Sequence, residues 1–135
     1  MKTRDAAVRL KRFNATEMAR KVTDLEHMIR EFEQMAMDLD RQISAEEDRT
    51  GVKDIAHFAY STFAKAAIQR RDNLLRSAGD MRDQLEAAQD ALAEAVEDMK
   101  KVELLDQREH TREAAEDAKV EQAQYDEIGR LRYKR

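Results

Sequence analysis

The chain has 135 residues, of which 41% are hydrophobic and 40% are charged, and its formal net charge is −4. Alanine supplies 21 of the hydrophobic positions, and because alanine buries little apolar area, the composition excludes a thick globular core. Cysteine and proline are absent and glycine occurs three times, which excludes disulfides and thiolate metal sites and favours long helices over sheets.

The first predicted helix carries a heptad pattern. Its apolar residues lie alternately three and four positions apart, a spacing that stays on one stripe only when two helices supercoil. The pattern predicts a helix over about residues 3–49, and because Asn14–Glu17 resembles a capping box, it starts near either Thr3 or Asn14. The seam residues are Ala15, Met18, Val22, Leu25, Ile29, Phe32, Ala36, Leu39 and Ile43.

A break follows this seam at Arg49–Asp54, which contains Gly51 and is the Gly-centred turn signal between the two apolar patterns. We therefore expect a tip over about residues 50–61. Ser61 or Thr62 is suited to cap the next helix, because its hydroxyl accepts a hydrogen bond from a free backbone N–H.

The second predicted helix runs over about residues 62–129 and carries a second heptad seam, with Gly129 as its expected C-terminal cap. The seam becomes polar after Val102, so we expect about residues 106–135 to be partly unpaired. The seam residues are Leu74, Ala78, Met81, Leu85, Ala88, Leu92, Ala95, Met99 and Val102.

The charge distribution predicts the relative direction of the two helices. Residues 24–48 carry two basic and nine acidic side chains, and residues 64–82 carry five basic and two acidic ones. An antiparallel hairpin places these opposite charges side by side and brings the basic residues 1–21 beside the acidic stretch around Asp90 to Asp106, whereas a parallel dimer would pair like charges. We predict one all-α domain over residues 1–135, an antiparallel two-helix coiled-coil hairpin with a longer second helix.

Three of the seven aromatic residues, Phe58, Tyr60 and Phe63, lie close together at the expected tip. Two interpretations remain open. The rings close the open end of a thin coiled coil, or they form a docking patch, since aromatic side chains are favoured anchors at interfaces.

Basic residues gather near both ends of the sequence. An antiparallel hairpin brings Arg4, Arg9, Lys11 and Arg12 toward the region of Arg130, Arg132, Lys134 and Arg135, which predicts a positive pole. Because the chain is acidic overall, we favour an acidic protein partner over nucleic acid.

The sequence predicts no catalytic residues, no metal site and no cofactor. His27, His57 and His110 are far apart in the sequence, and a two-helix fold offers no enclosed pocket. No apolar run follows the charged residues 1–5, and none approaches the ~20 residues of a membrane span, so we expect a cytoplasmic protein.

Four segments carry a resemblance to one known family. They are Arg9–Phe13, Lys100–Arg108, Glu121–Ile128, and the stretch from His57–Tyr60 to Gln69–Leu74. With the expected hairpin, they make most of the chain resemble the FliJ family, the stalk proteins of flagellar type III export. The last segment resembles the alphaproteobacterial branch of that family.

The resemblance implies a non-enzymatic stalk that couples the export ATPase to the membrane export gate and assists export chaperones. Family members bind the hexameric flagellar export ATPase through the terminal end of the coil and the cytoplasmic domain of the export gate protein near the tip. The resemblance therefore implies a cytoplasmic protein that is peripheral at the inner membrane. It assigns the tip aromatics to the gate and, to the ATPase, Arg9, Lys11, Arg12, Arg108, Arg130 and Arg132.

Two alternatives of other classes remain open. One is a generic coiled-coil scaffold that self-associates through its exposed tail, for which substitutions at the tip and the positive pole would be functionally silent. The other is a nucleic-acid binder that uses the positive pole, for which binding would fall steeply with salt.

Overall fold

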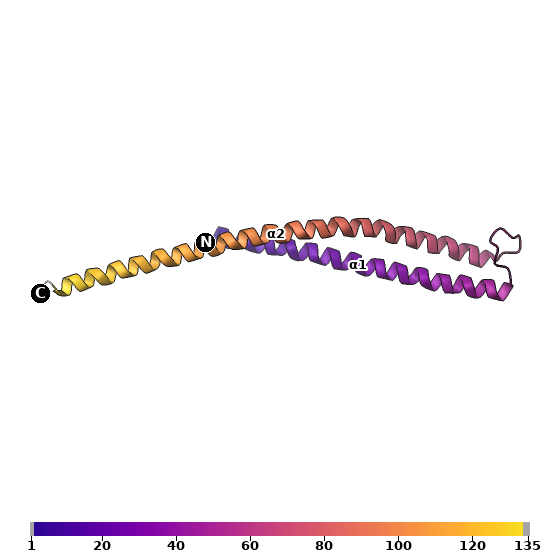
Figure 1. Cartoon of the computed structure of the whole chain (residues 1–135), viewed down its shortest axis with the longest axis horizontal. Helices are drawn as coiled ribbons and strands as arrows, with labels where there is room; N and C mark the ends of the chain where they lie inside the picture. The colour runs from indigo at the N-terminus through magenta and orange to yellow at the C-terminus, as the bar shows by residue number, and fades with distance from the viewer. Residues whose placement is uncertain (1, 134–135) are drawn as a thin grey trace. The chain divides into compact units, whose positions relative to one another are not determined.

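The computed structural model describes residues 2–133 as two helices and a short loop. Helix α1 spans Lys2–Thr50 and helix α2 spans Thr62–Tyr133, and no strand occurs within the described range. The chain divides into two compact units: unit 1 comprises the described residues of 1–15 and 94–135, and unit 2 comprises 16–93. Within each unit, α1 and α2 lie side by side and run in opposite directions (Figure 1). The predicted all-α antiparallel architecture, with a longer second helix, is confirmed.

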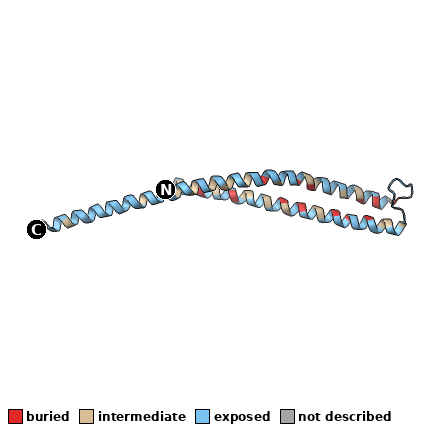
Figure 2. Ribbon diagram, in the orientation of Figure 1, coloured by how far each residue is buried: buried red, intermediate tan, exposed pale blue. Residues whose placement is uncertain are grey.

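The apolar seams meet along the facing sides of the two helices in unit 2. Leu25 and Ile29 of α1 pack with Met81 and Ala88 of α2, and Val22, Phe32 and Leu85 complete this cluster. Nearer the tip, a second cluster contains Leu39, Ile43 and Ala67, with Ile68 and Leu74 packed against it. Every predicted seam residue is buried or half-buried, and Figure 2 shows the buried positions on the facing sides of the ribbons. The core is therefore a single narrow stripe.

Ion pairs between the helices bear out the charge argument in unit 2. Arg71 of α2 contacts Asp40 of α1 at 2.8 Å, and Arg82 contacts Glu33. These pairs join the basic 64–82 stretch to the acidic 24–48 stretch. Their side chains are 28–56% exposed, so water screens these pairs and they specify the direction of pairing more than they stabilise it.

The tip turn begins at Gly51, as predicted. Gly51 has a φ of +73°, a conformation that glycine adopts without the steric penalty of a Cβ. Its N–H donates to the Glu47 carbonyl at 2.8 Å and so closes α1. Helix α2 then begins behind Ser61, whose Oγ accepts a hydrogen bond from the Ala64 N–H at 3.2 Å, the expected N-cap contact.

Of the two expected starts of the first helix, the structure has the earlier one, whereas the expected end at Gly129 is wrong. Helix α1 begins at Lys2, next to Thr3, and runs through Asn14, and α2 runs through Gly129 to Tyr133. Contacts of Arg4 with α2 hold the start of α1 in place, so the capping box at Asn14 is not needed. A single glycine inside a helix costs only about 1 kcal/mol, and the arginine- and leucine-rich residues beyond Gly129 favour helix.

Two glycines of unit 2 should respond to alanine with opposite signs. Gly51→Ala is expected to lower the free energy of unfolding by about 1 kcal/mol, because an L-residue is strained in the left-handed region. Gly79→Ala is expected to raise it by about 0.5–1 kcal/mol, because Gly79 lies inside α2 and nothing lies within 4 Å of an added Cβ. Urea unfolding measures both, and shifts of the same sign would contradict the assignment of the turn.

Candidate functional site

The tip loop, residues 51–61, is held by its own backbone and by side chains. The Ala56 N–H donates to Asp54 Oδ1 at 3.0 Å, and the Ala59 N–H donates to His57 Nδ1 at 3.0 Å. Two further backbone bonds run from His57 to Asp54 and from Tyr60 to His57, each at 3.0 Å. These four hydrogen bonds give the loop a defined backbone path.

Tyr60 fastens this loop to α1. Its side chain is 5% exposed, and its hydroxyl donates to Glu47 Oε2 at 2.8 Å. Burial first, and then the hydrogen bond to Glu47, raise the pKa of the Tyr60 phenol above its ordinary value of 10.0. Beside it, the Ser61 hydroxyl donates to Glu46 at 3.0 Å, and hydrogen bonds from Arg49 and then Ser61 lower the pKa of Glu46.

The other aromatic side chains of the tip face solvent. Phe58 is 95% exposed and stacks on the His57 ring with centroids 4.6 Å apart, and Phe63 is 56% exposed. Ile55, which the sequence interpretation missed, is 53% exposed in the same loop. The loop thus separates the predicted trio: Tyr60 closes the end of the coil, whereas Phe58 and Phe63 remain accessible to a partner.

In unit 1, ion pairs between α1 and α2 form a charged stripe, hereafter the ionic seam. Arg4 occupies the heptad position before Val8, and its guanidinium contacts Asp106 at 2.7 Å, Glu113 at 3.4 Å and Glu109 at 4.0 Å. These side chains are half-buried. A hydrogen bond from Arg112 is the main cause of a lowered pKa at Glu109. The sequence predicted opposite charges here as blocks, without identifying Arg4 as their centre.

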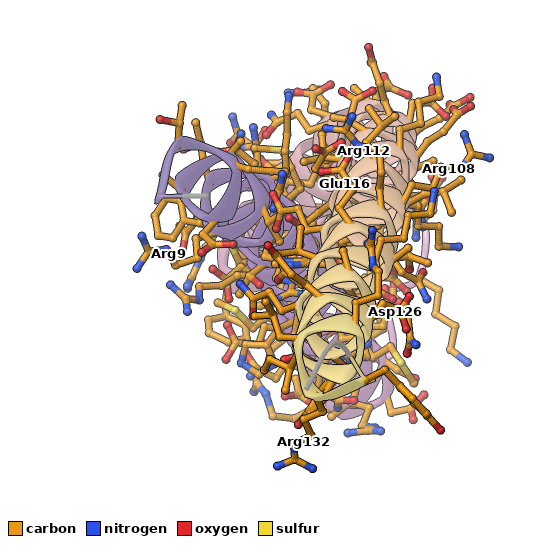
Figure 3. The ribbon with its side chains drawn as sticks, turned by 90° about the vertical axis from the view of Figure 1, so that its left-hand side faces the viewer. Arg9, Arg108, Arg112, Glu116, Asp126 and Arg132 are labelled. Atoms are coloured by element: carbon orange, nitrogen blue, oxygen red, sulfur yellow. The ribbon has the colours of Figure 1, made fainter. Side chains whose placement is uncertain are left out.

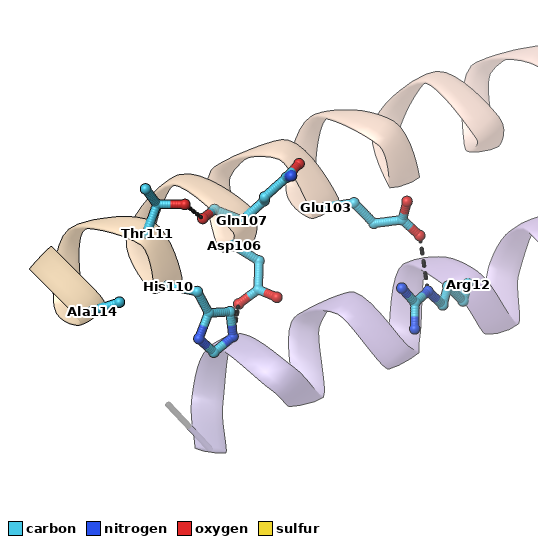
Figure 4. A pocket seen from close by; sticks show the side chains of 7 residues that line it. All are labelled: Arg12, Glu103, Asp106, Gln107, His110, Thr111 and Ala114. Atoms are coloured by element: carbon cyan, nitrogen blue, oxygen red, sulfur yellow. Dashed lines mark hydrogen bonds and ion pairs between the residues drawn. The ribbon is translucent and has the colours of Figure 1, made fainter.

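A groove lies along this ionic seam (Figure 4). Arg12 crosses it to contact Glu103 at 2.8 Å, and His110 Nε2 lies 3.4 Å from Asp106 Oδ1. Asp5, Asp106 and His110 bring potential metal-ligand atoms within 4.8 Å of one another, but the same Asp106 oxygen already binds the Arg4 guanidinium. The arrangement therefore serves ion pairing between the helices. The groove is lined by Arg12, Glu103, Asp106, Gln107, His110, Thr111 and Ala114.

The structure distributes the predicted basic residues over several sides of unit 1. Arg12 is paired with Glu103, and Lys11 is half-buried at a seam position. Figure 3 shows Arg9, Arg108 and Arg132 pointing to three different sides, and all three are exposed, as is Arg130. Among the described residues, these cations therefore lie on separate sides of unit 1 and do not form one basic patch. Lys134 and Arg135 lie outside the described residues.

The last part of α2 extends past the start of α1, as Figure 1 shows. This segment, residues 114–133, is hereafter the tail, and every residue in it except Gly129 is exposed. Its large apolar side chains are Val120, Tyr125, Ile128 and Leu131, which are 51–71% exposed, and Tyr133. The tail is thus a single helix without a partner within the described chain. The expected start of this unpaired stretch, near residue 106, is too early, because Arg4 contacts Asp106, Glu109 and Glu113.

Neither helix of the described chain has a stretch long and apolar enough to cross a bilayer. Comparison with known proteins gives no matching curated protein and no matching solved structure. The model of one protein family, described as "Flagellar FliJ protein", matches residues 2–135. That family is a non-enzymatic structural component. Over nearly its whole length, then, this two-helix chain belongs to the FliJ family of the flagellar export apparatus.

Proposed function

We propose that this chain is a stalk that couples the hexameric flagellar export ATPase to the cytoplasmic domain of the export gate protein, and that it assists export chaperones. In this proposal the tail and the cations around it engage the ATPase, and the exposed tip residues engage the gate. The chain would then work at the cytoplasmic face of the inner membrane, held there by its protein partners.

The tail is the observation that carries the proposal. A single helix with its side chains is about 10–12 Å across. It would therefore fit into a central opening of the ATPase hexamer that is too narrow for a pair of helices. The tail offers such a helix over residues 114–133, exposed on its sides and basic at its end through Arg130 and Arg132. Separate cations on several sides impose little geometric demand, which suits a partner whose subunits act in turn.

Removal of the tail tests this role. A chain that ends after Glu113 keeps the Arg4 contacts and both apolar seams, so we expect its thermal unfolding to change little. Its stimulation of ATP hydrolysis by the purified export ATPase should fall at least about 10-fold, since the docking helix is gone. Full stimulation by the shortened chain would refute the role of the tail.

The tip makes a separate prediction. Phe58→Ala is expected to weaken binding of the cytoplasmic domain of the export gate about 10-fold, because an exposed aromatic anchor is lost. Since the Phe58 side chain is 95% exposed, the melting temperature of the Phe58→Ala variant should match that of the wild type. Titration calorimetry measures the binding, and the exposed Met37, also in unit 2, provides the control Met37→Ala. Equal binding by Phe58→Ala and wild type would remove the tip from the gate interface.

A further inference from the structure

The tail has one apolar face. Val120, Gln124, Ile128 and Leu131 follow one another at steps of four, four and three residues, which places them along one side of a helix. Tyr125 borders this side, and a shallow hollow lies between Tyr125, Ile128, Gln124 and Glu121. Within the described chain no second helix covers this face.

Charge along the tail is divided into two opposite halves. Residues 114–127 carry five acidic side chains and one basic one, a net charge of −4. The sequence from 128 to 135 carries four basic side chains and no acidic one. A helix with this distribution complements a copy of itself that runs in the opposite direction.

We propose that the tail pairs antiparallel with the tail of a second copy of this chain, with the two-fold axis between Tyr125 and Asp126. In this register Val120 faces Leu131 of the other copy, and Glu121 lies beside Arg132 on the same flank of the pair. Each apolar face is then covered by the other, and each acidic half lies beside a basic half. The interface is isologous, so two copies satisfy it and the assembly closes as a dimer.

Other occupants fit the tail less well. A parallel pair of tails would place the two basic ends together, and like charges side by side are destabilising. An acidic peptide would be repelled by the first half of the tail, which is itself acidic. An anionic lipid surface would meet the same repulsion over residues 114–127. A second copy of the tail, running in the opposite direction, is the partner whose charges complement both the acidic and the basic half.

The proposed pair is small and therefore weak. A tail of about 20 residues is about 30 Å long, and two such helices bury less than the ~1,200 Å² of a stable complex. We expect single chains at about 10 µM and pairs at several hundred µM. Because the tail is also the segment proposed above to enter the ATPase, pairing and docking would exclude each other; that consequence alone rests on the proposed function.

Sedimentation equilibrium tests the pairing without the ATPase. The average mass of the wild type should rise from one chain, 15.7 kDa, toward two chains between about 10 µM and about 500 µM. Ile128→Ser with Leu131→Ser should stay at one chain throughout. The matched control is Leu104→Ser with Leu105→Ser, which changes exposed leucines of unit 1 outside the tail and should pair like the wild type. A one-chain mass for the wild type at the highest concentration would overturn the proposal.

Cysteine cross-linking tests the direction of pairing, because the chain has no cysteine of its own. Tyr125→Cys, next to the proposed axis, should form a disulfide-linked dimer with itself under mild oxidation. Val120→Cys and Leu131→Cys, which face each other in the proposed register, should cross-link when the two variants are mixed, and at least about 10-fold less when each is alone. Self-linking of Val120→Cys as efficient as that of the mixture would indicate a parallel pair and would also overturn the proposal.

Discussion

Tyr60→Ala is expected to lower the melting temperature of the chain by about 10 °C, the largest effect of any single tip substitution. Tyr60 is 5% exposed, so removal of its ring leaves a cavity where the loop meets α1. The change also leaves Glu47 without the hydroxyl that donates to it at 2.8 Å. Thermal unfolding followed by circular dichroism measures the shift.

Tyr60→Phe separates the ring from the hydroxyl. The ring remains in place, so we expect a decrease in melting temperature of only about 2–4 °C from the lost hydrogen bond. Phe58→Ala is the matched control within the same loop, since its ring is 95% exposed and makes no comparable cavity. If Phe58→Ala lowers the melting temperature as much as Tyr60→Ala does, the assignment of Tyr60 as the buried ring and Phe58 as the exposed ring is wrong.

The raised pKa of Tyr60 adds a pH dependence to this prediction. Burial and the hydrogen bond to Glu47 favour the neutral phenol in the folded chain. The corresponding stability is therefore fully present below the ordinary pKa of 10.0 and is lost as the pH rises above it. Wild-type stability should fall more steeply above pH 10.0 than that of Tyr60→Phe, which has no phenol at this position. Parallel curves for the two proteins would contradict the burial of the phenol.

The sequence predicted the helices and their seams because these follow from spacing alone. Leu25, Ile29 and Met81 lie on heptad stripes, and the apolar side chains of such a stripe become buried when a second helix packs along it. The turn at Gly51 was predictable for a similar reason, since a single glycine between two strong patterns marks where the chain reverses. These features depend on local sequence and on one simple packing rule.

The sequence did not distinguish Tyr60 from Phe58 because the tip has no periodicity. Both are aromatic residues two positions apart in an irregular loop, and only the folded path of the loop places one ring inside and the other outside. The capping signals at Asn14 and Gly129 failed for a different reason. Asn14 and Gly129 are local signals, and helix continues through both because neighbouring residues and the Arg4 contacts favour it.

For the ionic seam, the charge distribution predicted which segments of the two helices meet but not which side chains form ion pairs. Block charges predicted that the start of α1 meets an acidic stretch of α2, and the pairs of Arg4 and Arg12 with that stretch agree with it. The charge distribution along the sequence did not predict that these ion pairs neutralise basic side chains of the expected positive pole. Among the basic residues predicted for the positive pole, Arg9, Arg108, Arg130 and Arg132 are exposed.

Reversal of three exposed cations is expected to slow association with the export ATPase about 100-fold at low salt. The variant carries Arg9→Glu, Arg108→Glu and Arg132→Glu, which point to three sides of unit 1 (Figure 3). Its helix content should equal that of the wild type, since the three side chains lie outside the seam. Stopped-flow fluorescence at two ionic strengths measures the rate, and the wild-type rate should fall with salt as screening shortens the electrostatic range to about 8 Å.

Two further variants make this last prediction specific. Arg30→Glu, Arg70→Glu and Arg76→Glu change the net charge equally but lie in unit 2, so this control should slow association at most about 3-fold. Arg12→Glu places a carboxylate against Glu103, its present partner at 2.8 Å, and should loosen the start of α1 with a smaller effect on the rate. If the unit 2 control slows association as much as the unit 1 variant, net charge alone steers the encounter. If the wild-type rate does not change with salt, the exposed arginines do not steer it at all.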